Sequence, residues 1–243
     1  MANKYREDKD LEMLRYADNE MLKFLVEYLT KDEKGNIRLS EELLDNENFK
    51  KSNGDYKQAW KEIAAELQHF GGDTFVNQCR GSGVLYREIL MDVCKKIKVE
   101  FNDSQETINI EQNLLSRLFE KAWSEMSQQE KNDIRNKLGI DSKLAGSALL
   151  ASILASISSG IISRKISLLL AKAVAQALIG TSLSTAAWLG STRLLGIFTG
   201  PIGWATIGLL IVPAISGPAF RVTLPCVIQI SAIRQQMLGK NYF

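Results

Sequence analysis

Three side chains in the first third of the chain have the types found in a nucleophilic active site. His69 and Asp73 lie four residues apart, and Cys79 follows six residues later. A thiolate nucleophile needs a base within hydrogen-bonding reach and a third group that orients the base. Gly71-Gly72 interrupts the helix between His69 and Asp73, so a shared helix face is not assured. We favour packing of His69 beside Phe70 at a helix end, and we expect no catalytic residue.

Glycine pairs around this block suggest a second chemistry, the binding of a phosphate. Gly71-Gly72 and Gly81-x-Gly83 could cradle a phosphate at the start of a following helix. Phosphate- and dinucleotide-binding fingerprints need a strand before the glycines, and no strand pattern precedes them. We therefore favour tight turns and close helix packing as the role of these glycines. We expect any partner to contact this corner through His69, Asp73, Arg80, Tyr86 and Arg87.

Other residue types that bind metals or nucleic acids lack the necessary spacing. The chain has one His, and its Cys79, Cys94 and Cys226 form no C-x-x-C pair, so we expect no metal and no cofactor. The three cysteines are typical of small buried side chains. Lys95-Lys96-x-Lys98 follows Asp92, a mixture typical of a solvated face. Without a stripe of alternating aromatic and basic residues, we expect no nucleic-acid partner.

Charge is distributed unevenly along the 243 residues. Residues 1–143 carry 23 basic and 28 acidic side chains, whereas residues 144–243 carry seven basic side chains and no Asp or Glu. This asymmetry predicts a soluble helical domain over 1–140 and an apolar helical module over 143–238. The charged N-terminus has no apolar signal sequence, and free thiols favour a reducing compartment, so we expect a cytoplasmic location.

Residues 1–140 show the apolar spacing and capping signals of short helices. Asp18 precedes a helix with Met21, Leu22, Leu25 and Leu29 on one face. Ser127 and Glu130 form a capping box that begins a helix ending near Gly139. Further helices are expected over 56–70, 84–97 and 107–126. No period-two strand pattern appears, so the predicted class is all-α.

The second part contains three long stretches without acidic residues. They cover 144–163, 166–192 and 194–220, and the middle one carries Lys172. About 20 apolar residues span a bilayer as a helix, so length permits spanning. Lys172 and the prolines of the third stretch, Pro201, Pro213 and Pro218, argue against simple spanning helices.

Small residues recur in this part at helical spacing. Ala148, Ser152, Ser156 and Gly160 form a row at spacing four, and Gly196 and Gly200 repeat the pattern. Such rows let helices approach closely, as they do in lipid. The row predicts a Gly/Ala/Ser-rich apolar helical hairpin that packs on the first domain, on a second copy of the chain or in a membrane. Trp188 and Trp204 fit either a membrane interface or a core.

Two sequence blocks resemble a known family. Residues 66–73 (ELQHFGGD) and 80–93 (RGSGVLYREILMDV) resemble the YaaW-type family of uncharacterised bacterial proteins. Residues 5–29 are similar to the short domain often placed before that block, and 216–225 (SGPAFRVTLP) also match. The family is grouped with a domain similar to ubiquinol–cytochrome c chaperones, which are helical assembly factors. The resemblance implies chaperone-like helices over 56–138 and no reaction. Residues 144–215 are more apolar than is usual for the family.

The combined patterns favour a non-enzymatic, membrane-associated interaction or assembly factor with a chaperone-like role. We expect membrane lipid and an unidentified protein as partners, a homo-oligomer as a further assembly, and a location at the cytoplasmic side of the inner membrane. One alternative is a triggered membrane-inserting or pore-forming effector of a toxin or defence type. A second is a soluble oligomeric scaffold with a buried apolar hairpin. A third, an enzyme built on His69 and Cys79, is the one we disfavour.

Overall fold

The chain folds into helices. The computed structural model describes residues 4–32, 36–38, 42–72, 83–160, 166 and 218–238. The only β contact in these ranges is one bridge between Lys31 and Ile37. The predicted all-α class is therefore confirmed. In chain order the helices are η1 (Glu12–Tyr16), α1 (Asn19–Thr30), α2 (Glu47–Lys51), α3 (Trp60–Gly72), α4 (Tyr86–Lys96), α5 (Thr107–Glu125), α6 (Gln128–Leu138), α7 (Gly146–Ser158) and α11 (Pro218–Leu238).

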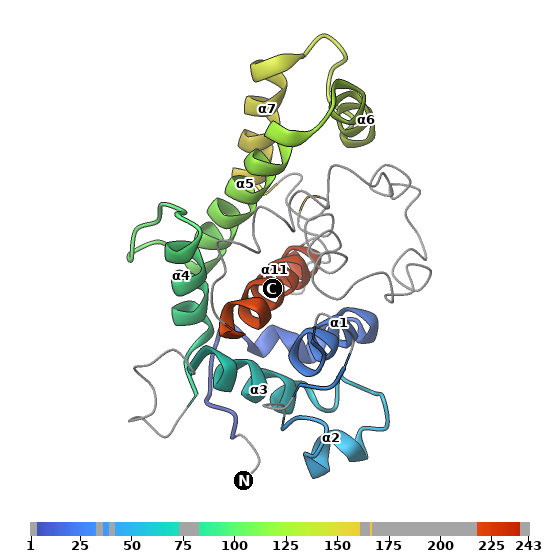
Figure 1. Ribbon diagram of the computed structural model, residues 1–243, viewed down its shortest axis with the longest axis vertical. Helices are drawn as coiled ribbons and strands as arrows, with labels where there is room; N and C mark the ends of the chain where they lie inside the picture. The colour runs from blue at the N-terminus through green and yellow to red at the C-terminus, as the bar shows by residue number, and fades with distance from the viewer. Residues whose placement is uncertain are drawn as a thin grey trace.

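Helix α11 lies at the centre of the molecule, although it comes from the end of the chain (Figure 1). It packs against η1, α1, α3, α4 and α5, and every residue from 222 to 233 is buried. A helix that is apolar on nearly all sides is stable only when neighbours surround it. The sequence grouped 218–238 with the apolar module, and in the structure this helix packs among η1, α1, α3, α4 and α5. The predicted apolar helical module over residues 143–217 stays a prediction.

The first helices follow the predicted pattern closely. Asp18 is the N-cap residue of α1, and Leu22, Leu25 and Leu29 are buried on its inner face. The Asp18 side chain does not cap the helix but accepts a hydrogen bond from the Gln236 amide of α11. The predicted start of α1 is thus confirmed. The Asp18 side chain makes a tertiary contact with α11 instead of capping the helix.

Helix α3 begins at Trp60, later than the predicted residue 56. Residues 56–59 form a turn, in which the Tyr56 backbone N–H donates to Asn19 Oδ1 at 2.7 Å. The Asn19 amide also donates to the Gly54 carbonyl at 2.9 Å. These two bonds hold the preceding turn against α1 and delay the start of the helix.

Helices α5, α6 and α7 form the far end of the molecule (Figure 1). The capping box of Ser127 and Glu130 begins α6, and Gly139 ends it with a φ of 71°. Both predicted boundaries are confirmed. Helix α7 packs on α5 through Leu149, Ile153 and Ile157.

Candidate functional site

The structure describes three of the five predicted partner-binding residues, His69, Tyr86 and Arg87, at the corner formed by α3 and α4. His69 is half-buried in the last turn of α3, and Arg87 is half-buried at the start of α4. Tyr86 is fully buried. Asp73 and Arg80 lie outside the described residues, as does Cys79. The proposed contact of this set with a partner stays a prediction.

The glycines of this corner allow α3 and its surroundings to pack closely. A Cβ on Gly71 would lie 2.5 Å from Ile89 Cγ1, and a Cβ on Gly83 would lie 2.6 Å from Gln68 Cβ. Real Cβ atoms do not approach other carbons so closely, so a larger residue would force the helices apart. The distances favour packing over phosphate binding as the reason for these two glycines.

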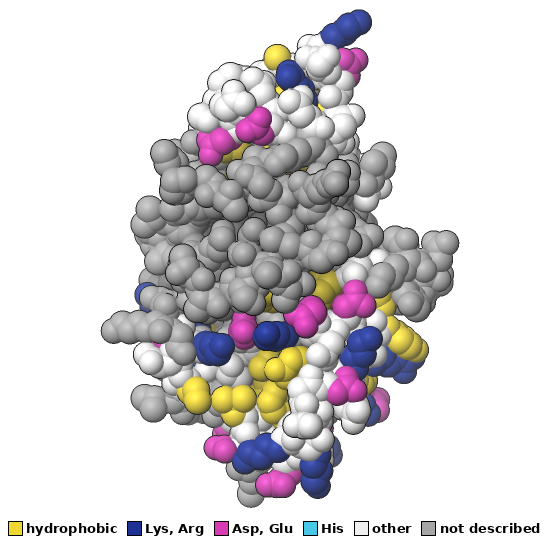
Figure 2. All heavy atoms as spheres, turned by 90° about the vertical axis from the view of Figure 1, so that its right-hand side faces the viewer, with side chains coloured by type: hydrophobic (Ala, Val, Ile, Leu, Met, Phe, Trp, Pro, Cys, Tyr) yellow, Lys and Arg dark blue, Asp and Glu magenta, His cyan; other side chains and the backbone are white. Residues whose placement is uncertain are grey.

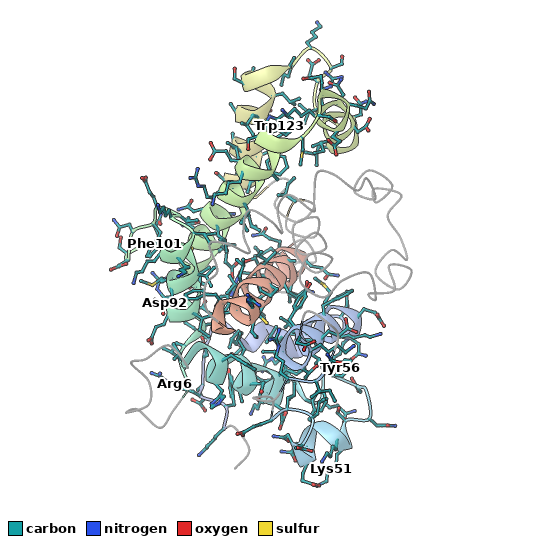
Figure 3. All side chains as sticks on the ribbon, viewed as in Figure 1. Arg6, Lys51, Tyr56, Asp92, Phe101 and Trp123 are labelled. Carbon is teal, nitrogen blue, oxygen red and sulfur yellow. The ribbon has the colours of Figure 1, made fainter. Side chains whose placement is uncertain are left out.

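An extended N-terminal segment, residues 4–8, lies against the same corner. The Gln68 side chain accepts from the Arg6 backbone N–H and donates to the Arg6 carbonyl, both at 2.9 Å. The Arg6 guanidinium donates to the Gly83 carbonyl at 3.1 Å. The Tyr86 backbone N–H donates to Asp8 Oδ2 at 2.6 Å. The segment is therefore fixed by α3 and by the start of α4, at the opposite end of the molecule from Trp123 (Figure 3).

A buried charged cluster lies next to this corner, in the interior of the protein. Glu111 on α5 is fully buried and accepts from the Tyr86 hydroxyl at 2.7 Å. Arg234 on α11 donates from Nε to both Glu111 oxygens, at 3.1 and 2.9 Å. The Arg234 guanidinium carbon lies 5.8 Å from the centre of the Tyr86 ring. One buried carboxylate is thus shared by side chains from α4 and α11.

The cluster extends to the N-terminal segment and to the start of α5. Arg234 donates to the Asp10 carbonyl at 2.9 Å and lies 4.0 Å from its carboxylate. The Thr107 hydroxyl donates to Asp10 Oδ2 at 2.9 Å. Arg87 donates to the Thr107 hydroxyl and to the carbonyls of Asp103 and Gln105. Arg87 therefore positions the loop before α5. We name the set of Asp10, Tyr86, Glu111 and Arg234 the Arg234 cluster.

Burial controls the ionisation of this cluster. It raises the pKa of Glu111 above its ordinary value, although the charge of Arg234 and the hydrogen bond from Tyr86 act in the opposite direction. It also raises the pKa of Tyr86 well above the ordinary range, and the nearby Glu111 charge adds to this shift. The Asp8 pKa is raised by burial too, against hydrogen bonds from the backbone of Tyr86 and Asp10.

The cluster is suited to holding helices together. Its groups donate to and accept from one another, and the charges lie in the interior. The two described thiols are equally enclosed, because burial raises the pKa of Cys94 to about 12 and that of Cys226 higher still. A thiolate, the reactive form, is therefore disfavoured at both positions. In the described ranges no three His, Cys, Asp or Glu side chains are grouped to hold a metal ion.

The face shown in Figure 2 carries Lys and Arg side chains interspersed with Asp and Glu. A nucleic-acid footprint needs a continuous basic patch, and the described part of this face has none. The absence of a nucleic-acid partner stays a prediction.

The small-residue row lies along α7 and just beyond its end, and it is only partly exposed. Ala148 is exposed, and Ser152, Ser156 and Gly160 are half-exposed. The large side chains of α7 instead face α5. Gly196, Gly200, Trp188 and Trp204 lie outside the described residues. Among the residues that the structure covers, no helix combines the length and hydropathy needed to cross a bilayer.

Comparison with known proteins identifies the family. The domain of unknown function DUF3944 matches residues 5–39. A UPF0174 protein of Helicobacter pylori strain J99 is 37% identical over 244 residues, which cover 99% of this chain and 96% of the relative. The UPF0174 protein YaaW of Escherichia coli K12 is 35% identical over 242 residues, which cover 96% of each chain. The chain belongs to the UPF0174 family. No solved structure matches it.

Family membership confirms the resemblance to YaaW-type proteins. The similarity of 56–138 to ubiquinol–cytochrome c chaperones finds no support in these comparisons and stays a prediction. The DUF3944 match contains η1 and α1, which form part of one core with α3 and α11. In this UPF0174 chain, the matched segment is therefore built into the body of the protein.

No sequence motif marked Glu111, Arg234 or Gln68 as a site residue, and Asp10 was predicted only as the cap of a helix over residues 11–16, whose N-cap is Leu11. The sequence does contain a pattern that indicates burial of Glu111 and Arg234. Glu111 precedes the buried Leu114, Leu115 and Leu118 at helical spacing, so it falls on the apolar face of α5. Arg234 falls in line with the buried Val227 and Ile230 of α11 in the same way. Opposite charges on two apolar helix faces indicate a buried pair.

Proposed function

We propose that this protein is a non-enzymatic interaction or assembly factor that associates with membranes through residues 144–217. The outer face of α7, which begins this stretch, carries the proposal. It presents small uncharged side chains: Ser147, Ala148, Ala151, Ala155 and Ser158 are all exposed. Small residues let a second helix approach the backbone closely, in lipid or in a partner protein.

The charge pattern favours a lipid surface as the setting. No Asp or Glu follows residue 143, whereas Arg164, Lys165, Lys172 and Arg193 interrupt the apolar stretches. Acidic headgroups attract such cations, and the absence of acidic side chains removes the opposing repulsion. An unidentified protein partner and a second copy of the chain are the other candidates for the small-residue face. We place the site of action at the cytoplasmic side of the inner membrane.

The non-enzymatic part of the proposal rests on how the polar groups are used. Tyr86 and Glu111 are buried, Arg234 is mostly buried, and the three are bonded to one another, whereas Arg87 is bonded to the loop before α5. Cys94 and Cys226 are enclosed in the core. Such groups stabilise a scaffold and are not presented to a substrate.

Flotation with vesicles tests the proposal. The full chain is mixed with vesicles of neutral and acidic phospholipids and centrifuged through a density gradient. The variant Ala151→Asp/Ala155→Asp places two acids on the exposed face of α7 without touching its packing on α5. The matched control Gln128→Glu/Asn136→Asp adds the same charge to exposed positions of α6. A truncation after residue 142 is unsuitable, because it removes α11 from the core.

We expect the wild-type chain and the control to float with the vesicles, and the α7 variant to float at least about fivefold less, since acidic headgroups repel the added charge. Wild-type protein that stays at the bottom of the gradient with every vesicle composition overturns the proposal and favours the soluble scaffold. Release of a dye from the same vesicles favours the pore-forming effector over an assembly factor.

A further inference from the structure

Helix α11 is unusual for a core helix, because it contains an internal proline and two buried polar atoms without hydrogen-bond partners. Pro225 lies inside the helix and has no backbone N–H to donate. Gln229 Oε1 and Gln235 Nε2 are buried and have no hydrogen-bond partner among the described residues. Buried polar atoms without partners destabilise the folded state. The helix is therefore held less firmly than its burial alone would indicate.

Polar contacts in the second half of α11 compensate for these imperfections. Arg234 bonds to Glu111 on α5 and to the carbonyl of Asp10, which lies in the turn after the N-terminal segment. The Gln229 amide donates to the Met21 carbonyl of α1 at 3.0 Å, and Gln236 donates to Asp18. Three of these four contacts join the last described helix to residues within the first 21 of the chain.

We infer that α11 is a releasable helix, which the Arg234 cluster latches into the body and which opens before the rest of the protein unfolds. Local opening of single elements below the global unfolding free energy is a general property of proteins, and the least stable elements open first. Opening of α11 uncovers the inner face of α1, with Leu22, Leu25 and Leu29, and the thiol of Cys226. The inference does not depend on membrane association.

Cys226 provides a probe of the opening, because it is fully buried in α11. In a Cys79→Ser background, which keeps Cys94 and Cys226, Ala122→Cys places a third thiol at a fully buried position of α5, which packs on α7. The folded full-length protein is treated with an alkylating reagent under native conditions. Mass spectrometry then gives the labelling rate of each thiol. The ratio of the rates at Cys226 and at position 122 separates opening of α11 from unfolding of the whole chain.

We expect Cys226 to react at least about tenfold faster than the thiol at position 122. Arg234→Met leaves the Glu111 carboxylate buried without its cation, so labelling of Cys226 rises about 100-fold. Glu111→Gln/Arg234→Met removes both charges and keeps an acceptor for the Tyr86 hydroxyl, so its rate lies well below that of the single variant. Arg117→Met, at an exposed ion pair with Glu120, leaves both rates unchanged.

Equal labelling rates at both positions in the parent protein overturn the inference, because α11 then opens only when the whole chain unfolds. This comparison needs no charge variant, so it decides the question even if Arg234→Met does not fold. An unchanged labelling rate of Cys226 in a folded Arg234→Met protein, with native far-UV circular dichroism, overturns the role of the Arg234 cluster as the latch.

Discussion

Helices α7 and α11 both come from the part of the chain without acidic residues, yet they occupy different positions. Helix α11 is surrounded by other helices, and each residue from 222 to 233 is buried. Helix α7 buries only one stripe, Leu149, Ile153 and Ile157, and exposes alanines and serines on its other side. An apolar composition alone therefore does not decide where a helix lies.

Side-chain size explains much of the difference. Helix α11 carries large residues in several directions, including Val227, Ile228, Ile230 and Ile233, so that burial on all sides gives a large hydrophobic gain. Helix α7 has large residues in one direction, and its small residues lose little by contact with water. The same small residues leave room for another helix to approach, which is the basis of the proposed interaction.

Removing the buried cation of α11 is the largest perturbation that this comparison suggests. We expect Arg234→Met to lower the free energy of unfolding by about 3 to 5 kcal/mol, because it leaves Glu111 buried without its charged partner. Arg117→Met on the surface of α5 is the control, with a loss below about 1 kcal/mol. Urea unfolding followed by circular dichroism measures both. Equal losses would show that the buried pair is not a special support of α11.

Enlarging an alanine in each helix sharpens the contrast. Ala232 of α11 is fully buried, so Ala232→Leu overpacks the core and lowers the unfolding free energy by about 1 to 3 kcal/mol. Ala151 of α7 is exposed, so Ala151→Leu changes it by less than about 0.5 kcal/mol. The measurement is again urea unfolding, with both variants in the same buffer. A large loss for Ala151→Leu would mean that the outer face of α7 is packed within the monomer.

The pH dependence of stability gives a smaller effect. The Glu111 pKa is raised in the folded chain, so the folded state binds a proton that the unfolded state has already released. The unfolding free energy therefore decreases as pH rises from the ordinary glutamate pKa, about 4.3, through the raised value, and this contribution is constant above it. The variant Glu111→Gln lacks this pH-dependent contribution, because glutamine does not ionise. Urea unfolding across the acidic range, wild type against Glu111→Gln, should show a shallower decrease for the variant, and identical slopes would contradict the assignment.

Local signals in the sequence predicted much of the fold. The capping box of Ser127 and Glu130 and the left-handed Gly139 placed the ends of α6 correctly, because both act within one turn of the chain. Asp18 likewise marked the start of α1. The start of α3 was predicted too early, since a bond from Tyr56 to the distant Asn19 determines it. Tertiary contacts of this kind leave no local pattern.

The candidate site was less accessible to sequence reasoning than the helices. Tyr86 and Arg87 were identified as polar residues of the α3–α4 corner, but their partners Glu111 and Thr107 lie on another helix. Helix α11 was grouped with the apolar module because a helix buried on all sides and a helix in lipid have the same apolar composition. Only the packing against α1 and α3 distinguishes them.

Hydrogen exchange measured by mass spectrometry, with and without vesicles containing acidic lipid, tests the contrast between α7 and α11 most directly. We predict that peptides from α7 become more protected when vesicles are added, because its outer face gains a contact. Peptides from residues 222–233 of α11 should exchange at the same rate in both conditions, because this helix gains no contact with the vesicles. Unchanged exchange in α7, or equal gains of protection in both helices, would contradict the division of the two helices into an interaction surface and a core element.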